Sequence, residues 1–335
     1  MALSKIETGS LNFTPATKDG TKNLIINGAM QVAQRGTSFS SISSDQYTLD
    51  RFIAFHTSVT PTITQESLSV GQTDLPSSFR NYLRFAAGTG AAVLGFGTRI
   101  EDVSKYYGTY KLSFYAKGTN PAGGSFQQRM IQRFGTGGSS QVITDNGTFT
   151  VTSSWQRFEI DVTVPSVSGK TIGTGSYLQM QFNQPSTDSG TSAWTLDITG
   201  VQLEVGDTAT PFEHRSFADE LVRCQRYFMQ WKSNNATREF VAMCTYFDDD
   251  DGHGIISTPV TMRTYPSILY NDLAVFKRGV TATNSVVVQS VVAPIGDANT
   301  IPFNMDNAGG LNAGEAFFVG FASTTTGYIK LDAEL

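Results

Sequence analysis

The stretch Tyr110-Lys-Leu-Ser-Phe-Tyr-Ala-Lys117 alternates apolar and polar side chains along its whole length. Successive side chains of a β-strand point to opposite faces, so this alternation predicts a strand with one buried and one solvated face. The same pattern recurs in Trp155-Gln-Arg-Phe-Glu-Ile-Asp-Val162 and in Tyr177-Leu-Gln-Met-Gln-Phe182. We therefore expect half-buried antiparallel strands in this part of the chain.

Short runs of this kind repeat from about Asn23 to about Gly206, and turn-forming residues separate them. The turns are predicted at Asn120-Pro-Ala-Gly-Gly124, Asp145-Asn-Gly147, Ser168-Gly169 and Asp188-Ser-Gly190. Many short strands at such spacing favour a two-sheet sandwich of the jelly-roll type, which we place at residues 23–212. Residues 1–22 are polar and weakly patterned, and we expect them to form an arm or anchor.

The composition excludes several classes of protein. Only 16% of the 335 residues are charged, whereas an ordinary soluble domain has about 25%. The net charge of -5 argues against a nucleic-acid binder, which needs a basic face. No apolar run is long enough for membrane insertion. The sequence MALSKIETGS lacks the apolar segment of a secretory signal, so we expect synthesis and folding in a cytoplasm.

One α-helix is predicted after the jelly roll, within a linker at residues 213–232. Ser216 is a suitable N-cap, and an apolar stripe at helical spacing predicts a helix over residues 217–229. The stripe consists of Phe217, Leu221, Cys224 and Phe228.

Residues 233–335 return to strand patterns and predict a second, smaller and again sandwich-like β domain. The chain is thus expected to be mostly β. Its two cysteines, Cys224 and Cys244, are expected to be buried thiols and not a disulfide, because no secretory signal is present.

Three stretches together carry a resemblance to a known family. The first is Asn23-Leu-Ile-Ile-Asn-Gly-Ala-Met-Gln-Val-Ala-Gln-Arg-Gly36 with Tyr47-Thr-Leu-Asp-Arg-Phe52. It resembles the opening of the jelly-roll module in bacteriophage tail-fibre and related virion proteins. The second, Ile198–Gly206 followed by Thr210–Leu221 and Cys224–Phe228, is similar to the close of that module and its following helix. Residues 260–267 and 331–335 look like the short β domain that often comes next.

The module also resembles carbohydrate-binding jelly rolls, through Leu112-Ser-Phe-Tyr-Ala-Lys117 and Ser154-Trp-Gln-Arg-Phe158. The resemblance implies a sugar-binding or adhesive fold, a homotrimer and a place in the virion. In such modules an acidic residue after the opening Asn-Gly pair helps to hold a structural calcium ion. Gln31 stands near that place here, which weakens the expectation of an ion.

Candidate sugar contacts are aromatic. Tyr106 and Tyr107 precede the strand at 110 and are candidates for a glycan-binding platform at a sandwich edge. Trp155 has a suitable flat ring, but its place before Phe158 and Ile160 favours packing in the core. Asp50-Arg51 and Glu213-His214-Arg215 are interpreted as structural ion pairs at strand ends.

The acidic run Asp248-Asp-Asp-Asp-Gly-His253 is the most distinctive polar cluster. A solvated turn between strands is the favoured interpretation. The alternative is calcium binding by Asp248, Asp249, Asp250 and Asp251, because crowded carboxylates repel one another unless a cation bridges them. The run does not follow the helix–loop–helix calcium pattern. We expect no cofactor, with structural calcium as the one alternative.

Catalytic motifs are missing: no nucleophile elbow, phosphate loop or metalloprotease helix pair is present. We therefore expect a non-enzymatic virion structural protein of a bacteriophage, most simply a tail-fibre or receptor-binding subunit for a host surface glycan. A capsid decoration or tail-assembly protein, bound to other virion proteins through residues 1–22, is the alternative. A glycan depolymerase is a third hypothesis and needs two converging carboxylates.

Overall fold

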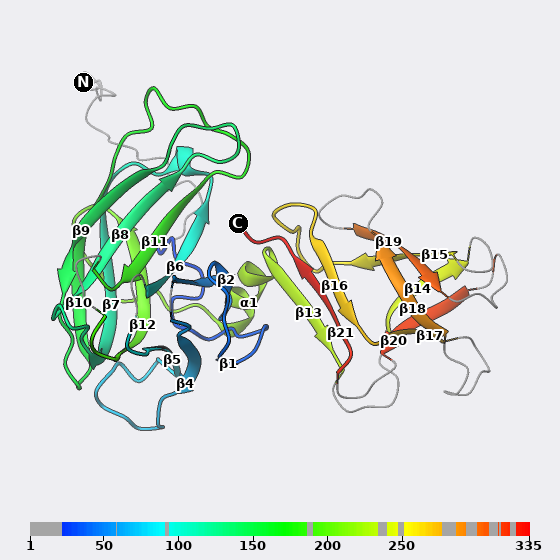
Figure 1. The fold of residues 1–335 in the computed structure, drawn as a ribbon, viewed down its shortest axis with the longest axis horizontal. Helices are drawn as coiled ribbons and strands as arrows, with labels where there is room; N and C mark the ends of the chain where they lie inside the picture. Colours follow the sequence, from blue (N-terminus) through cyan, green and yellow to red (C-terminus); the bar gives the residue numbers. More distant parts are fainter. Residues whose placement is uncertain are drawn as a thin grey trace, which may run out of the picture. The chain divides into compact units, whose positions relative to one another are not determined.

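The fold comes from a computed structural model that describes residues 22–335 except 58, 91–93, 186–189, 234–239, 247–250, 277–285, 293–299, 308–313, 315 and 322–325. The chain divides into two compact units, one ending at Phe217 and also including Leu335, the other running from Ala218 to Glu334. Both consist mainly of antiparallel strands (Figure 1), so the predicted mostly-β fold class is confirmed. Among the described residues, no helix has the length and apolarity needed to cross a membrane.

The first unit is a jelly-roll sandwich of two six-stranded sheets. The first sheet has the order β1 (Ser38–Phe39), β4 (Thr62–Ser67), β5 (Asn81–Ala87), β12 (Trp194–Val205), β7 (Gly108–Thr119), β10 (Gln156–Val164). The second has the order β2 (Gln46–Tyr47), β3 (Phe52–His56), β6 (Leu94–Glu101), β11 (Tyr177–Asn183), β8 (Phe126–Arg133), β9 (Val142–Phe149). The three stretches that predicted strands coincide with β7, β10 and β11, except that Trp155 precedes β10.

The alternation of β7 places its apolar side chains between the two sheets. Leu112 and Phe114 are fully buried in a core that is rich in aromatic rings. Phe85 stacks on Trp194 with ring centroids 5.1 Å apart, and the Trp194 indole N–H donates to Gln184 Oε1 at 2.9 Å. Truncating one such ring to alanine costs about 3–5 kcal/mol, so this core fixes the spacing of the sheets.

The opening Asn-Gly pair is a tight structural turn. Asn27 has a φ of 61°, and its side chain bonds to both backbone groups of Val32 and to the Asp50 carbonyl. A Cβ on Gly28 would lie 2.1 Å from the Val201 carbonyl oxygen, so only glycine fits here. The turn therefore packs directly against β12, near the close of the module.

One predicted turn is wrong. Asp145-Asn-Gly147 lies inside β9, and the ladder with β8 shifts register opposite it, between Gln128 and Arg129. Gly147 has a φ of 125°, so the segment that reads as a turn is an irregularity within a continuing strand. Of the turn predicted at 188–190, residues 188 and 189 lie outside the described residues.

The helix is shorter than predicted. Helix α1 covers Phe217–Gln225, and strand β13 (Phe228–Lys232) follows at once, so the linker at 213–232 is only partly helical. The Tyr227 N–H donates to the Cys224 carbonyl at 2.9 Å, and β13 then pairs with β21 (Tyr328–Asp332). Pairing with a distant strand buries Phe228, which overrides the local helical period.

The second unit contains a closed barrel and a three-stranded sheet, which corrects the expectation of a second sandwich-like domain. The sheet has the order β13, β21, β16 (Ser267–Asn271). The barrel has the order β14 (Phe240–Tyr246), β15 (Asp251–Ser257), β19 (Thr300–Asn307), β18 (Val286–Val292), β17 (Leu273–Phe276), β20 (Ala316–Phe321). Cys224 and Cys244 are buried cysteine thiols, as predicted.

Candidate functional site

The outer face of the second jelly-roll sheet contains a trough along β6. Leu94 and Phe96 of this strand point into the core, so Gly95 and Gly97 occupy the outward positions. A Cβ on Gly97 would lie 1.9 Å from the Met180 carbonyl oxygen. Side chains are thus excluded from two successive outward positions, and the surface is hollow beside the first of them, Gly95.

Amide side chains of β11 stand beside this trough. Gln181 pairs with Gly97 on one side and with Arg129 on the other, and Asn183 pairs with Gly95. Figure 1 shows β6, β11, β8 and β9 running side by side. The resulting hollow has a volume of about 200 Å³ and is lined by Ser44, Asp45, Phe55, His56, Thr57, Gly95, Arg129, Arg133, Gln179, Gln181 and Asn183.

A second hollow of about 540 Å³ begins at Arg133, which lines both. Two loops form its walls, and backbone bonds hold them together: Thr136 N–H donates to Thr174 O at 2.9 Å, and Ser139 N–H donates to Thr171 O at 2.9 Å. Its lining consists of Arg133, Phe134, Gly135, Thr136, Ser139, Ser140, Gln141, Thr174, Gly175 and Tyr177. We call the two hollows together the amide groove.

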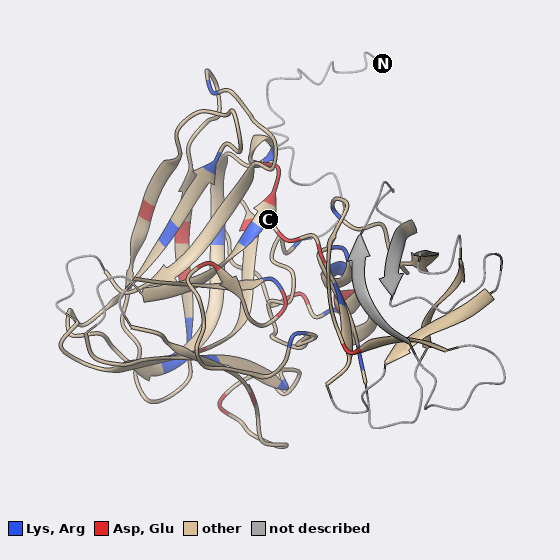
Figure 2. Cartoon of the chain, turned by 45° about the vertical axis from the view of Figure 1, so that its right-hand side comes forward, with Lys and Arg blue, Asp and Glu red and all other residues tan. Residues whose placement is uncertain are grey.

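Most charges near the amide groove are paired. Arg129 holds Asp145 with two bonds, Nε to Oδ1 at 2.6 Å and Nη2 to Oδ2 at 3.2 Å. Arg99 pairs with Asp45 at 3.0 Å. The exposed guanidinium of Arg133 has no hydrogen-bond or ion-pair partner in the part of the chain that the structure describes. Figure 2 shows how few charged positions the jelly roll carries.

The chemistry of the amide groove suits a hydroxyl-rich ligand. Amides both donate and accept hydrogen bonds, and neighbouring sugar hydroxyls need both. The Gln181 amide makes no hydrogen bond within the described residues, and the buried Oδ1 of Asn183 has no donor there either. Phe55, Phe134 and Tyr177 add aromatic surface to the lining.

The predicted tyrosine platform lies elsewhere. Tyr106 is half-buried against the jelly-roll core, whereas Tyr107 is 36% exposed. Both follow the short 3-10 helix Val103–Lys105 and line neither hollow of the amide groove. Glycan contact by Tyr106 and Tyr107 therefore stays a prediction.

Trp155 does not lie in the main core. It precedes β10 and packs in a small cluster with Phe79 on the outer side of the first sheet. Tyr82 meets it edge-on with ring centroids 5.3 Å apart, and Lys117 Nζ lies 5.1 Å from its ring centroid. The prediction that Trp155 packs in the core with Phe158 and Ile160 is therefore wrong: those two residues pack against the main core, and Trp155 packs in the separate cluster.

Most aspartates of the acidic run lie outside the described residues. Asp248, Asp249 and Asp250 lie outside the described residues, and only the backbone of Asp251, in β15, is described. Within the described part of the chain, no group of three or more His, Cys, Asp or Glu side chains is placed to hold a metal ion. Calcium binding by Asp248–Asp251 stays a prediction.

The opening turn does not fit calcium well. Both Asp50 oxygens accept hydrogen bonds from Gln34, each at 2.6 Å, and the Gln31 carbonyl accepts one from Gln65. Burial raises the pKa of Asp50 above its ordinary value, although Arg35 and the Gln34 donors act in the opposite direction. The one described carboxylate of this turn is thus already committed to Gln34.

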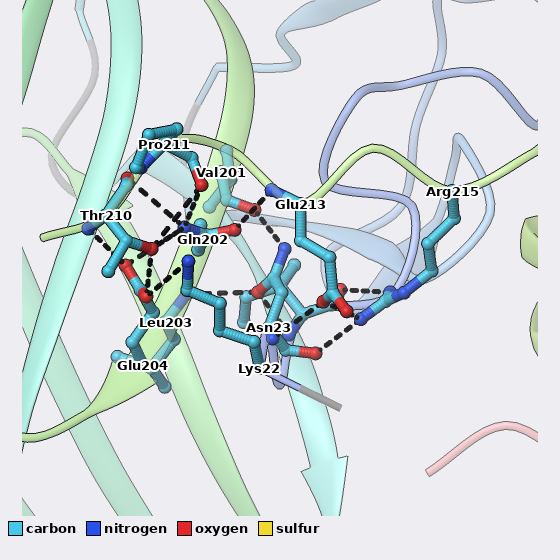
Figure 3. Close-up of polar contacts among 11 residues, drawn as sticks. Lys22, Asn23, Val201, Gln202, Leu203, Glu204, Thr210, Pro211, Glu213 and Arg215 are labelled. Carbon is cyan, nitrogen blue, oxygen red and sulfur yellow. Dashed lines mark hydrogen bonds and ion pairs between the residues drawn. The ribbon is translucent and has the colours of Figure 1, made fainter. Parts of the chain in front are cut away.

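Glu213 and Arg215 belong to a polar network that joins the opening of the module to its close (Figure 3). Arg215 Nη2 donates to Asn23 O at 2.7 Å and to Glu213 Oε2 at 2.9 Å, while Asn23 N–H donates to the same Glu213 oxygen. Asn23 Oδ1 accepts from Leu203 N–H at 3.1 Å. We call this set the closing network.

The closing network continues along β12. Gln202 donates to Glu204 Oε2 at 2.9 Å, and its own Oε1 accepts from Glu213 N–H at 2.8 Å. Thr210 N–H donates to Glu204 Oε2 at 3.0 Å. These contacts give the stretch 201–215 a structural role, as predicted for Glu213 and Arg215. Asp50 and Arg51, by contrast, bond to Gln34 and to the Arg99 carbonyl respectively.

Sequence reasoning did not find the amide groove. Its residues come from strands far apart in the chain, and each is unremarkable alone. The available signal was the pair of glycines in Gly95-Phe-Gly97, together with glutamines at the polar positions of Tyr177–Phe182.

No family model matches the chain, and no curated protein matches it. A similar solved structure is the enzymatically active domain of tailspike protein 4 from bacteriophage CBA120, with 17% identity over 54% of this chain and 21% of that one, at a TM-score of 0.32. The CBM22-1 xylan-binding domain from Paenibacillus barcinonensis shares 15% identity over 51% of this chain and 94% of that one, at a TM-score of 0.30.

A family 11 carbohydrate-binding module from Clostridium thermocellum shares 13% identity over 52% of this chain and 98% of that one, also at a TM-score of 0.30. The solved structures similar to this chain thus include carbohydrate-binding modules and a phage tailspike domain. The chain spans about a fifth of that tailspike domain.

Proposed function

We propose that this chain is a non-enzymatic bacteriophage virion protein, a tail-fibre or receptor-binding subunit whose jelly roll binds a host surface glycan in the amide groove. It is assembled in the host cytoplasm and resides in the virion. The observation that carries the proposal is that the Gln181 amide and the Arg133 guanidinium, which bond to no described residue, line a hollow beside Gly95, where no side chain fits. Such groups match the hydroxyls of a sugar chain.

The charges of the amide groove support binding without hydrolysis. A glycosidase of the usual kind needs two carboxyl groups facing each other across the scissile bond. The carboxylates that border the groove, Asp45 and Asp145, are each held by an arginine. Both carboxylates are thus used to position arginines.

Glycan binding is tested with the full chain and polysaccharides isolated from host cell surfaces. Gln181→Ala removes one free amide from the trough and is expected to weaken binding about five-fold. Gln156→Ala is the matched control, because Gln156 is exposed on the first sheet. Equal affinities of the wild type and Gln181→Ala would place the ligand elsewhere, and Tyr107→Ala then tests the tyrosine platform.

The place on the particle is tested by immuno-electron microscopy of whole virions. Label at fibre tips is the expected result. Label over the capsid surface would contradict the receptor-binding role and favour a decoration protein bound to other virion proteins.

We also propose a homotrimer, with the barrel as a contact surface between copies. Met243 of β14 pairs with Ile255 of β15 and with Phe318 of β20, and these side chains are 67%, 55% and 42% exposed. The Phe240 ring lies 4.8 Å from that of Phe318. We call these four residues the barrel apolar row.

Burying one such side chain contributes about 1.5–3 kcal/mol, so a row of four is a substantial drive toward association. Light scattering after size-exclusion chromatography is expected to give the mass of three chains, and Met243→Asp is expected to give single chains. A wild-type chain that elutes as a monomer would contradict the trimer.

A further inference from the structure

Arg133 occupies a special place in the amide groove. It is the last residue of β8 and is the one residue that lines both hollows. Across the ladder it pairs with Tyr177, whose ring is covered by the Arg99 guanidinium at 4.8 Å from the ring centroid. A ligand that spans both hollows must therefore pass Arg133.

The charge of Arg133 is uncompensated by its neighbours in the groove. Arg129 is matched by Asp145, and Arg99 is matched by Asp45. Glu101 lies on the far side of Tyr177 in the ladder and lines neither hollow. Within the described residues, Arg133 is thus the groove cation that lacks an anionic partner.

Apart from Asp45 and Arg129, which are each held in an ion pair, the side chains around Arg133 in the two hollows are mainly neutral and polar. Gln179 and Gln181 lie in one hollow, and Ser139 and Ser140 lie in the other. A guanidinium presents a planar fork of donors that fits a carboxylate with two parallel bonds. Neutral hydrogen-bonding groups flanking one such fork match a sugar chain in which hydroxyl-bearing residues flank a carboxylate.

We propose that the amide groove selects an acidic glycan, one that contains a uronic or other carboxylated sugar, and that Arg133 binds its carboxylate. This inference rests on the proposed glycan-binding function and specifies its ligand class. One cation without an ion-pair partner among the described residues fits a sparsely charged polysaccharide better than a densely charged polyanion, which the net charge of -5 repels.

The test uses the full chain and a panel of hyaluronan, glucuronoxylan and xanthan, in which neutral sugars flank the carboxylated ones. Densely charged alginate and two neutral polymers, arabinoxylan and β-glucan, serve for comparison. Each acidic polymer is measured before and after chemical reduction of its carboxyl groups to alcohols, which removes the charge and keeps the chain. The wild type is expected to bind at least one acidic polymer about ten-fold more tightly than its reduced form.

Variants then assign that preference to Arg133. Arg133→Gln is expected to bind the native and reduced forms equally, and Arg133→Lys to keep part of the difference, since it retains charge without the fork. Arg80→Gln, directly before β5 of the first sheet, is the matched control and should keep the full difference, because Arg80 is exposed and has no ion-pair partner among the described residues. Because Arg133 is exposed, an unchanged circular dichroism spectrum is expected for both variants.

The outcomes separate the two proposals. Equal binding of the wild type to native and reduced polymers overturns the acidic preference and leaves glycan binding standing. A preference that survives in Arg133→Gln overturns the role of Arg133. Binding to no polymer of the panel, acidic or neutral, counts against the proposed function itself.

Discussion

The outer surfaces of the two units differ in kind, although both are built from antiparallel strands. On the second jelly-roll sheet the outward positions are glycine, amide and arginine, and they form the amide groove. On the barrel, outward positions of three neighbouring strands are large and apolar, and they form the barrel apolar row. The side chains at the outward-facing positions of the strands thus decide whether a β unit suits a hydrated ligand or another protein surface.

The largest expected effect separates the stability of the two units. Gly97→Ala would place a Cβ 1.9 Å from the Met180 carbonyl oxygen, so β6 and β11 have to move apart. We expect a loss of about 3 kcal/mol or more in the unfolding free energy of the jelly roll. Urea denaturation followed by tryptophan fluorescence measures it in a Trp231→Phe background, because the two remaining tryptophans, Trp155 and Trp194, lie in this unit.

Gly88→Ala is the control for that variant. The nearest atom to a Cβ at Gly88 is a methyl carbon of Val59 at 3.5 Å, an ordinary contact, so little change is expected. If Gly97→Ala proves as stable as the control, then the close approach of β6 to β11 does not require glycine at position 97.

The next effect concerns the closing network. Arg215→Ala removes the donors to the Asn23 and Ile25 carbonyls and the partner of Glu213. The Arg215 side chain is only 8% exposed, so we expect a loss of about 2 kcal/mol, again confined to the jelly-roll transition. An equal shift in the barrel transition would show that the two units unfold together, and it would contradict the separate stability of the jelly roll.

A smaller effect depends on pH. Burial acts to raise the pKa of Glu213, but the Asn23 N–H and Arg215 outweigh it and hold that pKa below its ordinary value of 4.5. Ionised Glu213 therefore contributes stability above pH 4.5, and the contribution is lost as the pH falls through the lowered pKa of the folded state. We expect about 1 kcal/mol of acid-dependent stability to be missing in Glu213→Gln. Identical acid profiles for the two proteins would argue against this.

The smallest effect concerns the reactivity of the two cysteine thiols, which reports on the second unit alone. Both cysteines belong to the second unit, and burial raises the pKa of Cys244 to about 12. The folded chain is expected to show almost no reaction with Ellman's reagent, and full denaturation should expose both thiols. At urea concentrations that unfold the jelly roll of Gly97→Ala, as tryptophan fluorescence reports, the thiols should stay unreactive. Rapid labelling of the native wild type would show that the second unit opens on its own.

The sequence predicted what depends on local pattern. The alternation of Leu112 and Phe114 was enough to orient β7. The end of α1 was not predictable, because the strand at Phe228 forms only by pairing with β21. The amide groove was missed for the same reason: Gly97 and Gln181 become neighbours only through the register of β6 and β11.

The closing network also determines how the jelly roll carries mechanical load. Asn23, at the entry of the module, and Glu213 and Arg215, at its exit, are bonded directly to one another. Tension applied between residues 22 and 216 therefore pulls first on these few bonds and not on the strand ladders of the two sheets. The sheets and the amide groove are therefore expected to keep their shape under tension until the bonds of the closing network break.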